Sequence, residues 1–545
     1  MIRLAVIFAG LVMLLLATFF WSSGRVQARA DFTFINRGDV GTLDPNRMSW
    51  LQDIRLGYAL WEGLYTLDPA TLKAIPGSAD RIEISEDKTV YTFHIRASAR
   101  WSNGNAVTPG DFVFAWRRML EEPGDYTYLF AEIRGAKAYR EAFAAHQPAD
   151  FASVGIEAVD AQTLRVKLNH PVAYFPDMCA FPPFWPLHEP SMRPFFNAKT
   201  HSYGKGFTRP PNLVGNGPYR LAAWNFKRNL RLEASDYYWD RANVKSRTIN
   251  VLNADDPMWG FLQYDTKAID WLSDASGPIG AELYKNGRRD LHVFPAFGTY
   301  FYTINCMAKL PDGRVNPFAD VRVRKAFSMA IDRRGIVQTI TRLGEPVATT
   351  YIPPGVFDGY QSPVATGYDL AQARSLLAEA GYPNGRGFPK VGILFNNESL
   401  HADIAQYARR QWLENLNVDV GMEGQEVKIF RQRLHGKDYV LARASWFGDY
   451  NDPSTFTDKY RSNSENNDAG WINARYDQLC EQAAVEGDAG RRLRLFEQAE
   501  GALLGEQPII PLYYYVNAYL YSEKVRGLSL NPRNLVMLKS IEVTH

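Results

Sequence analysis

The sequence predicts a mixed α/β protein. Strands and helices alternate most regularly between residues 294 and 515, a pattern typical of an α/β unit. Residues 80–200 are richer in strand patterns and turns, and no flexible linker separates the two regions. We therefore expect lobes built from interleaved segments. The 545 residues exceed one compact core, so two or three domains are expected.

The first thirty residues are typical of an export signal. Arg3 precedes an uncharged apolar run at 4–21, and small residues then favour cleavage near Ala28 or Ala30. An uncleaved anchor is the alternative, because the run approaches the length of a spanning helix. No cysteine occurs in this segment, which excludes a lipid-modified N-terminal cysteine. We expect a periplasmic protein that is not a lipoprotein.

Charge and cysteine content exclude several classes of partner. The formal net charge of +2 becomes −1 once residues 1–30 are removed, and no basic stripe suggests nucleic acid. Cys179, Cys306 and Cys480 match no metal-site spacing, so we predict no metal and no cofactor. They are interpreted as small buried residues, with one disulfide as an alternative. We expect a monomer.

In the first half of the chain, local patterns predict the elements in order. Tyr91, Phe93 and Ile95 alternate with polar residues, as in a half-buried strand of a hairpin. Thr108, Pro109 and Asp111 form the start of a capped helix. The other expectations are a strand at 31–36, a turn at 41–45, a helix at 54–64, strands within 155–168, an ordered loop at 181–196, and a turn at 212–219 feeding a strand that pairs with 230–232.

In the second half, the helical pattern is strongest after Asp320. Apolar residues there recur at the spacing of one helix face. Further helices are expected at 369–380, 401–416 and 491–504, and strands at 294–305, 391–396, 439–442 and 509–520.

The stretch 442–456 reads A-R-A-S-W-F-G-D-Y-N-D-P-S-T-F and carries the most suggestive chemistry. Gly448 and the Asn-Asp-Pro run at 451–453 predict a turn. Asp449 stands among aromatic residues, with Arg443 six positions upstream. A carboxylate and ring faces together suit a small cation such as an ammonium group. The alternative is an ordinary surface turn.

No catalytic signature accompanies this stretch. The G-x-S-x-G, H-E-x-x-H, Walker and G-x-G-x-x-G patterns do not occur, and none of the nine histidines forms an i, i+4 pair. A Ser/His/Asp set assembled in space stays open, because spacing does not exclude it. We expect a protein that is not an enzyme, with a secreted hydrolase as the alternative of another class.

Several segments together resemble the bacterial extracellular solute-binding proteins that serve peptide ABC importers (family 5), most closely periplasmic oligopeptide-binding proteins. They follow the family's order along nearly the whole mature chain and include 91–117, N-G-P-Y at 216–219 with Y-Y-W-D at 237–240, P-F-A-D-V-R-V-R-K-A-F at 317–327, L-L-A-E-A-G-Y at 376–382, the stretch 442–456 with R-S-N-S at 461–464, and P-L-Y-Y-Y-V-N-A at 511–518.

The resemblance implies a three-lobed periplasmic-binding-protein fold of cluster C type with two hinge strands. Lobe I would comprise 31–75, 199–296 and 515–545, lobe II 76–198, and lobe III 297–514. A peptide would lie in the cleft between lobes I and III. The implied partners are this ligand and an inner-membrane ABC permease.

The resemblance also assigns roles to residues. Asp449 would hold the ligand's α-ammonium, with Arg443 keeping that acid ionised. Trp446, Tyr515 and Tyr126 match cleft residues, and His401 matches a position associated with the ligand's carboxyl end. A related amine-bearing solute, such as a cell-wall peptide, is the alternative ligand.

Five positions depart from the family pattern. Thr341 replaces a lysine, Val427 a cleft tryptophan and Ser49 an acid, while Gly298 and Phe447 replace a cysteine pair. These departures leave the amino-end anchor intact and leave ligand length and carboxylate binding open.

Overall fold

The computed structural model describes residues 29–254, 256–364, 367–398 and 400–544, and it shows a mixed α/β fold. The predicted export signal and Ala28 lie outside these residues. One ten-stranded sheet has the order β10-β11-β12-β1-β13-β18-β14-β17-β15-β16. In chain order its strands are β1 (Phe32–Asn36), β10 (Tyr219–Asn225), β11 (Asn229–Ala234), β12 (Thr248–Asn253), β13 (Trp271–Leu272), β14 (Leu291–Ile304), β15 (Val391–Asn396), β16 (Val420–Gln425), β17 (Leu441–Phe447) and β18 (Ile509–Tyr521).

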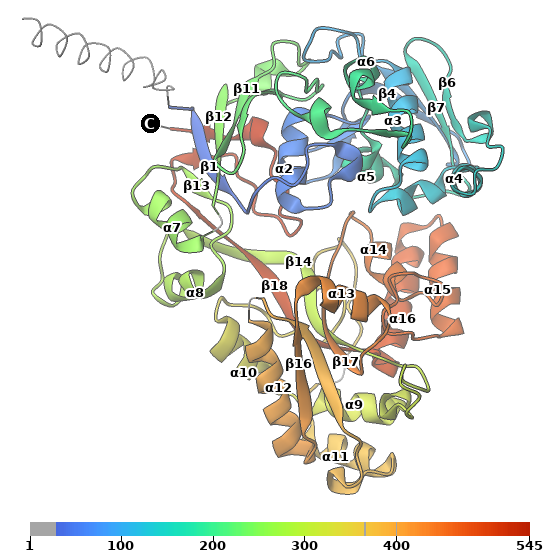
Figure 1. The fold of residues 1–545 in the computed structure, drawn as a ribbon, viewed down its shortest axis with the longest axis vertical. Helices are drawn as coiled ribbons and strands as arrows, with labels where there is room; N and C mark the ends of the chain where they lie inside the picture. Colours follow the sequence, from blue (N-terminus) through green and yellow to red (C-terminus); the bar gives the residue numbers. More distant parts are fainter. Residues whose placement is uncertain (1–28, 255, 365–366, 399, 545) are drawn as a thin grey trace, which may run out of the picture.

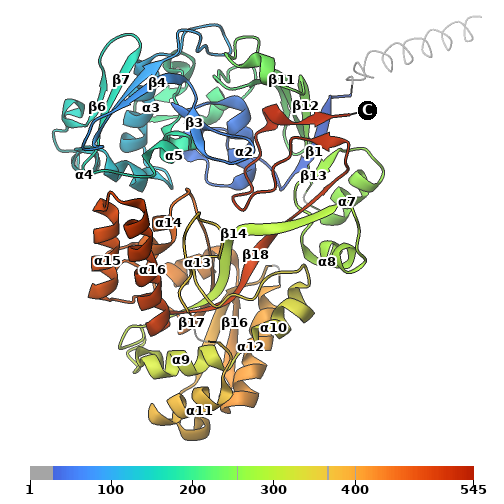
Figure 2. The same cartoon turned by 180° about the vertical axis from the view of Figure 1, so that it is seen from behind.

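Two long strands, β14 and β18, connect the two halves of the molecule (Figure 1, Figure 2). They are antiparallel neighbours, paired from Leu291 opposite Leu520 to Thr303 opposite Ile509, with irregularities between Pro295 and Thr299 and between Tyr300 and Phe301. The predicted lobe boundaries at 296/297 and 514/515 fall inside these two strands. Every segment that passes between the halves at these boundaries is therefore part of one sheet.

The first half adds a four-stranded antiparallel sheet, β4-β5-β7-β6. Helix α3 (Pro109–Glu121) begins at the predicted capping box, where the Thr108 backbone N–H donates to the Asp111 carboxylate at 2.7 Å. The other elements of this half are β2 (Tyr65–Leu67), β3 (Ala74–Pro76), β4 (Ala79–Ile84), β5 (Val90–Ile95), β6 (Ile156–Ala158), β7 (Thr163–Lys167), β8 (Phe196–Asn197), β9 (Ser202–Tyr203), β19 (Val525–Arg526), β20 (Glu542–Val543), α2 (Leu51–Leu60), α4 (Ala136–Ala144), α5 (Phe175–Cys179), α6 (Glu189–Met192), α7 (Pro257–Asp265) and α8 (Gly277–Lys285).

The second half surrounds β15, β16 and β17 with helices (Figure 1). Its core includes Tyr302, Phe327 and Trp412, and the Trp412 indole donates to the Phe327 carbonyl at 2.9 Å. A second cluster packs β17 against α14 and α16. The helices are α9 (Val321–Met329), α10 (Arg333–Ile336), α11 (Leu370–Glu379), α12 (His401–Leu416), α13 (Val427–His435), α14 (Ser454–Thr457), α15 (Ala474–Val485) and α16 (Ala489–Glu506).

Two local predictions are wrong. The turn predicted from residue 442 begins only after Phe447, because β14 pairs with β17 along its whole length, from Ile304 opposite Leu441 to Gly298 opposite Phe447. The loop predicted at 181–196 instead contains α6 and two short 3-10 helices.

The cysteines are unpaired in the structure, with Cys179 and Cys480 buried and Cys306 partly buried. None of the helices in the described part of the chain has the length and hydropathy needed to cross a membrane.

Candidate functional site

Asp449 lies just beyond the end of β17, and its carboxylate meets two tyrosines of the other half. The Tyr126 hydroxyl donates to Oδ1 at 3.1 Å, and the Tyr128 hydroxyl donates to Oδ2 at 3.2 Å. The backbone N–H of Asp449 donates to Thr455 Oγ1 at 2.8 Å, which fixes the loop. Two of the predicted site residues, Asp449 and Tyr126, are thus in direct contact, and this contact joins the two halves.

The carboxyl of Asp449 keeps its proton up to a higher pH than an exposed aspartate does. Burial raises the pKa of its carboxyl to about 6, against the opposing effect of the two hydroxyl hydrogen bonds and the nearby Arg533 guanidinium. An ionised carboxylate offers about four acceptor positions, of which the tyrosines use two. The carboxylate therefore retains acceptor capacity for an incoming cation. Binding of that cation is favourable, because its positive charge stabilises the ionised form of the buried carboxyl.

Arg533 and Asp177 complete the setting of Asp449. Arg533 donates to the Asp449 backbone carbonyl at 3.2 Å and forms an ion pair with Asp177 at 3.0 Å. Asp177 also accepts from the Asn451 backbone N–H at 2.9 Å. Sequence reasoning missed both residues. No local pattern marks them, because they reach the loop from 84 and 274 residues away.

Trp446 supports the loop from the other face of β17. Side chains alternate along a strand, so Trp446 lies opposite to the face of Arg443, Ser445 and Phe447. Its indole donates to the Thr455 carbonyl at 2.7 Å, and the Lys459 ammonium lies 4.9 Å from its ring centre. The observed contacts give Trp446 a positioning role, since Thr455 also binds the Asp449 backbone.

A second cluster of predicted residues forms around Arg443. The Arg443 guanidinium carbon lies 5.4 Å from the centre of the Tyr300 ring, and the Tyr300 hydroxyl is 3.1 Å from Nδ1 of His401. Tyr515 packs edge-on against Tyr300 at 6.1 Å. Arg443, His401 and Tyr515 are therefore close to one another, on the sheet face shared by β14, β17 and β18.

This second cluster has a cationic character. Burial, and then the charge of Arg443, lower the pKa of His401 to about 3, so His401 is neutral at physiological pH. The Nε of Arg443 is buried with no hydrogen-bond partner among the described residues. A buried guanidinium nitrogen without an acceptor is costly. The arginine that acts on the pKa of Asp449 is Arg533, so the predicted pairing of Arg443 with Asp449 stays a prediction.

One edge of β17 is open between these two clusters. β14 pairs with the first edge along the whole strand. On the second edge β15 pairs only with Leu441 and Ala442, and no other strand in the described residues pairs with 443–447 there. Unpaired backbone groups on a strand edge are a template for another extended chain.

The departures from the family pattern have clear local settings. The Thr341 hydroxyl donates to Glu345 at 2.8 Å, so this buried side chain is already satisfied. Val427 is the first residue of α13. Trp50, which follows Ser49, is 55% exposed, and the Arg431 guanidinium carbon lies 5.9 Å from its ring centre. This last contact connects α2 of the first half with α13 of the second.

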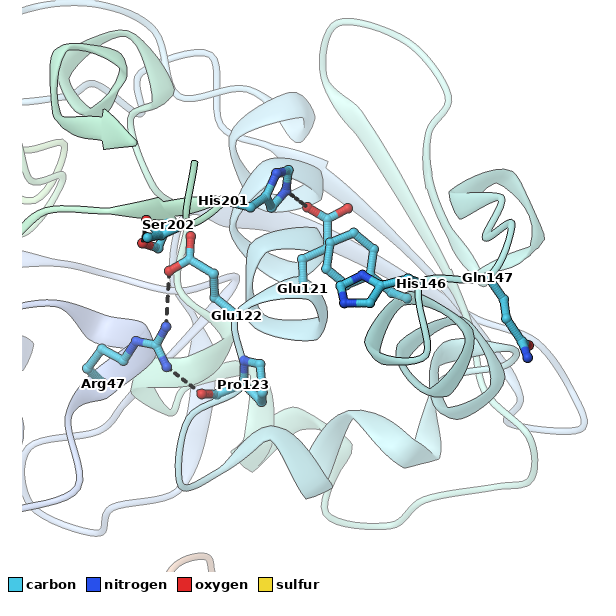
Figure 3. Close-up of a pocket in the computed structure, with 10 residues that line it drawn as sticks. Arg47, Glu121, Glu122, Pro123, His146, Gln147, His201 and Ser202 are labelled. Atoms are coloured by element: carbon cyan, nitrogen blue, oxygen red, sulfur yellow. Dashed lines mark hydrogen bonds and ion pairs between the residues drawn. The ribbon is translucent and has the colours of Figure 1, made fainter. Parts of the chain in front are cut away.

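A surface pocket of about 630 Å³ lies elsewhere in the first half and contains none of the predicted site residues (Figure 3). Its two carboxylates are paired: Glu121 with His201 at 3.3 Å, and Glu122 with Arg47 at 3.1 Å. Within the described residues, no group of three or more His, Cys, Asp or Glu could hold a metal ion.

Comparisons of the sequence and of the structure with known proteins point to the same family. Residues 73–468 match the family of bacterial extracellular solute-binding proteins, family 5 Middle. The oligopeptide-binding protein OppA of Bacillus subtilis is 31% identical over 83% of this chain and 82% of its own length. The periplasmic oligopeptide-binding protein OppA of Salmonella typhimurium is 31% identical over 93% and 91%, respectively.

Solved structures agree. The murein tripeptide binding protein MppA of Escherichia coli superposes with a TM-score of 0.78 at 28% identity, covering 95% of this chain and 99% of that one. The chain therefore belongs to the bacterial extracellular solute-binding proteins of family 5, whose members bind substrates without catalysing a reaction.

Proposed function

We propose that this protein is a periplasmic receptor that captures short peptides by their free amino end and delivers them to an inner-membrane ABC importer. The proposal rests on the carboxylate of Asp449, which lies two residues beyond the end of β17 and next to the open edge of that strand. Relatives named for binding oligopeptides and a murein tripeptide support the same ligand class.

The amino end of the ligand binds Asp449. An ammonium group offers three donors to a carboxylate whose burial has already raised its pKa to about 6. One such bond contributes roughly 1.5–3 kcal/mol net, whereas micromolar affinity requires about 8 kcal/mol. The rest of the ligand must therefore contribute most of the binding free energy.

The ligand backbone pairs with the open edge of β17 at residues 443–447. Backbone hydrogen bonds are the same for every peptide sequence, so this mode gives affinity without strong sequence preference. Water in the side-chain pockets adapts the remaining hydrogen bonds.

The carboxyl end of the ligand points toward Arg443 and His401. A peptide that starts at Asp449 and reaches Arg443 runs antiparallel to β17. The two residues are six positions apart, which is about 20 Å along a strand. After the reach of the two side chains is subtracted, peptides of about three to five residues fit at ~3.4 Å per residue. Arg443 and His401 then act on the carboxylate, in place of the lysine that Thr341 replaces.

Binding closes three lobes over the peptide. In this proposal β14 and β18 are the two hinge strands, and the ligand lies between lobe I (31–75, 199–296, 515–545) and lobe III (297–514), beside lobe II (76–198). Export through the segment 1–30 brings the receptor to the periplasm.

Calorimetry with the mature protein tests this function. A tripeptide with a free amino end should bind at least tenfold more tightly than its N-acetylated form, and Asp449→Asn should remove that difference. Equal affinity for both forms in the wild-type protein would refute the amine anchor. Native mass spectrometry of ligands that co-purify from the periplasm identifies the ligand, and murein tripeptide instead of mixed peptides would assign the protein to cell-wall recycling.

A further inference from the structure

Phe447 is a half-exposed aromatic residue at the open edge of β17, two positions before Asp449. Its side chain is 46% exposed, and its ring centre lies 4.8 Å from that of Tyr515 with an interplanar angle of 33°. Singly exposed apolar residues are common on protein surfaces and carry no meaning by themselves. Phe447 differs because its neighbours fix the ring beside the site.

Gly298 fixes the ring from below. Gly298 lies directly opposite Phe447 in the β14–β17 ladder, and a Cβ at Gly298 would come within 2.5 Å of the Phe447 ring. The ring therefore occupies the space that any side chain at Gly298 would need. Tyr515 closes one side, so the remaining surface of Phe447 faces outward in a fixed orientation.

The orientation of the strand determines what meets this ring. Arg443, Ser445 and Phe447 share one face of β17, because they alternate with Ala444 and Trp446. The side chain of Ser445 is small, so it projects less from this face than the side chains of Arg443 and Phe447 on either side of it. A chain added to the open edge would place alternate side chains on the same face, and the residues nearest Asp449 would lie beside Phe447.

We propose that Phe447 and Tyr515 form an aromatic platform that selects peptides with an aromatic or large apolar side chain at the first or second position. The inference rests on the proposed function, because it needs the ligand's amino end at Asp449 and its backbone on β17. Fixed rings bind another ring without losing rotamer freedom, so selectivity comes from preorganised surface. The receptor is then tolerant along most of the ligand and selective near its amino end.

The experiment is a calorimetric scan of tripeptides in which one phenylalanine moves along a background of alanine and serine. Wild-type protein should prefer phenylalanine at the first or second position by about fivefold to tenfold, with no gain at the third. Phe447→Ala should reduce this preference to less than twofold, where the preference is the ratio of the affinities of the phenylalanine peptide and the all-small peptide for the same protein.

Phe226→Ala is the matched control, because Phe226 is 62% exposed on the β10–β11 hairpin and far along the sheet from β17. It should keep the wild-type preference. A preference that survives Phe447→Ala, or wild-type protein with no preference at all, overturns the platform. Because the all-small peptide reports on the amine anchor, the backbone pairing and the carboxylate contact without the aromatic platform, its failure to bind would refute the proposed function instead. Thermal melting of each variant checks that it is folded.

Discussion

Asp177 and Arg533 form a buried ion pair at 3.0 Å, and each also holds the loop that carries Asp449. Arg533 binds the Asp449 carbonyl and Asp177 binds the Asn451 N–H. Tyr174 stacks on Tyr450 at 4.6 Å beside them. The loop of the second half is thus attached to the first half by a charged pair and a ring stack, in addition to the tyrosine hydroxyls on Asp449.

Asp177→Asn should release this attachment. The substitution leaves the buried Arg533 without its carboxylate, which costs roughly 3–5 kcal/mol when both partners are buried. We expect a lower melting temperature and a larger radius of gyration in small-angle scattering of the unliganded protein. Asp419→Asn is the control, because it removes an exposed pair with Arg409 at 2.8 Å, and such pairs contribute about 0–1 kcal/mol. An unchanged radius for Asp177→Asn would show that the pair does not hold the halves together.

Peptide affinity should depend on pH through Asp449. Its pKa of about 6 lies above the ordinary value of 3.8, so the empty site takes up a proton as the pH falls through 6. The ammonium of the ligand requires the ionised carboxylate of Asp449. The affinity should therefore reach its maximum above pH 7 and decrease as the pH falls below 6. At pH 5 binding should be about tenfold weaker than at pH 7.5. Calorimetry at both values measures this, and Asp449→Asn should be flat; a flat wild-type profile would contradict the assignment.

Removing the Arg443 guanidinium should abolish recognition of the ligand carboxylate. We expect wild-type protein to bind a tetrapeptide about tenfold more tightly than its C-terminal amide, since a hydrogen bond to a charged group contributes roughly 1.5–3 kcal/mol. Arg443→Gln should make the two ligands equivalent. Arg342→Gln is the control, because Arg342 is an exposed partner of Glu282 and follows Thr341, the position for which the family resemblance implies a lysine. Should Arg342→Gln abolish the discrimination instead, the carboxylate site belongs there.

Cysteines at 298 and 447 should form a disulfide. The two positions are directly opposite in the β14–β17 ladder, and opposed antiparallel residues have Cα atoms about 4.5–5.5 Å apart, within disulfide range. We expect intact-mass spectrometry of the double variant Gly298→Cys/Phe447→Cys, purified without reductant, to show two hydrogens fewer than its reduced form. The wild-type protein is the control, because its three cysteines are unpaired. A fully reduced double variant would place the ladder in a different register.

Sequence patterns predicted best those helices and strands whose bounds are determined by residues close together in the sequence. The bounds of β15 and α12 agree with prediction, and the capping box of α3 is present, because each depends on neighbouring residues. The predicted end of β17 at residue 442 was wrong, because the pairing of this strand with β14 outweighs the turn signals at Gly448 and 451–453. Asp449 and Arg443 were singled out from the local sequence and Tyr126 and His401 were added by the resemblance, whereas Tyr128, Asp177 and Arg533 were not predicted. Their contacts depend on tertiary structure that brings together segments as far as 356 residues apart.

The pairing of β14 with β18 constrains how the halves can move. Because the two connecting strands are hydrogen-bonded to each other along most of their length, we expect them to bend together. The ladder is irregular between Pro295 and Thr299, which is where such a ribbon bends most easily. Just there, the Phe297 N–H donates to the Pro532 carbonyl at 2.8 Å, next to Arg533. The Phe297–Pro532 contact therefore links the irregular part of the ribbon to the segment that holds the Asp449 loop, and we expect bending of the ribbon to be coupled to release of that loop.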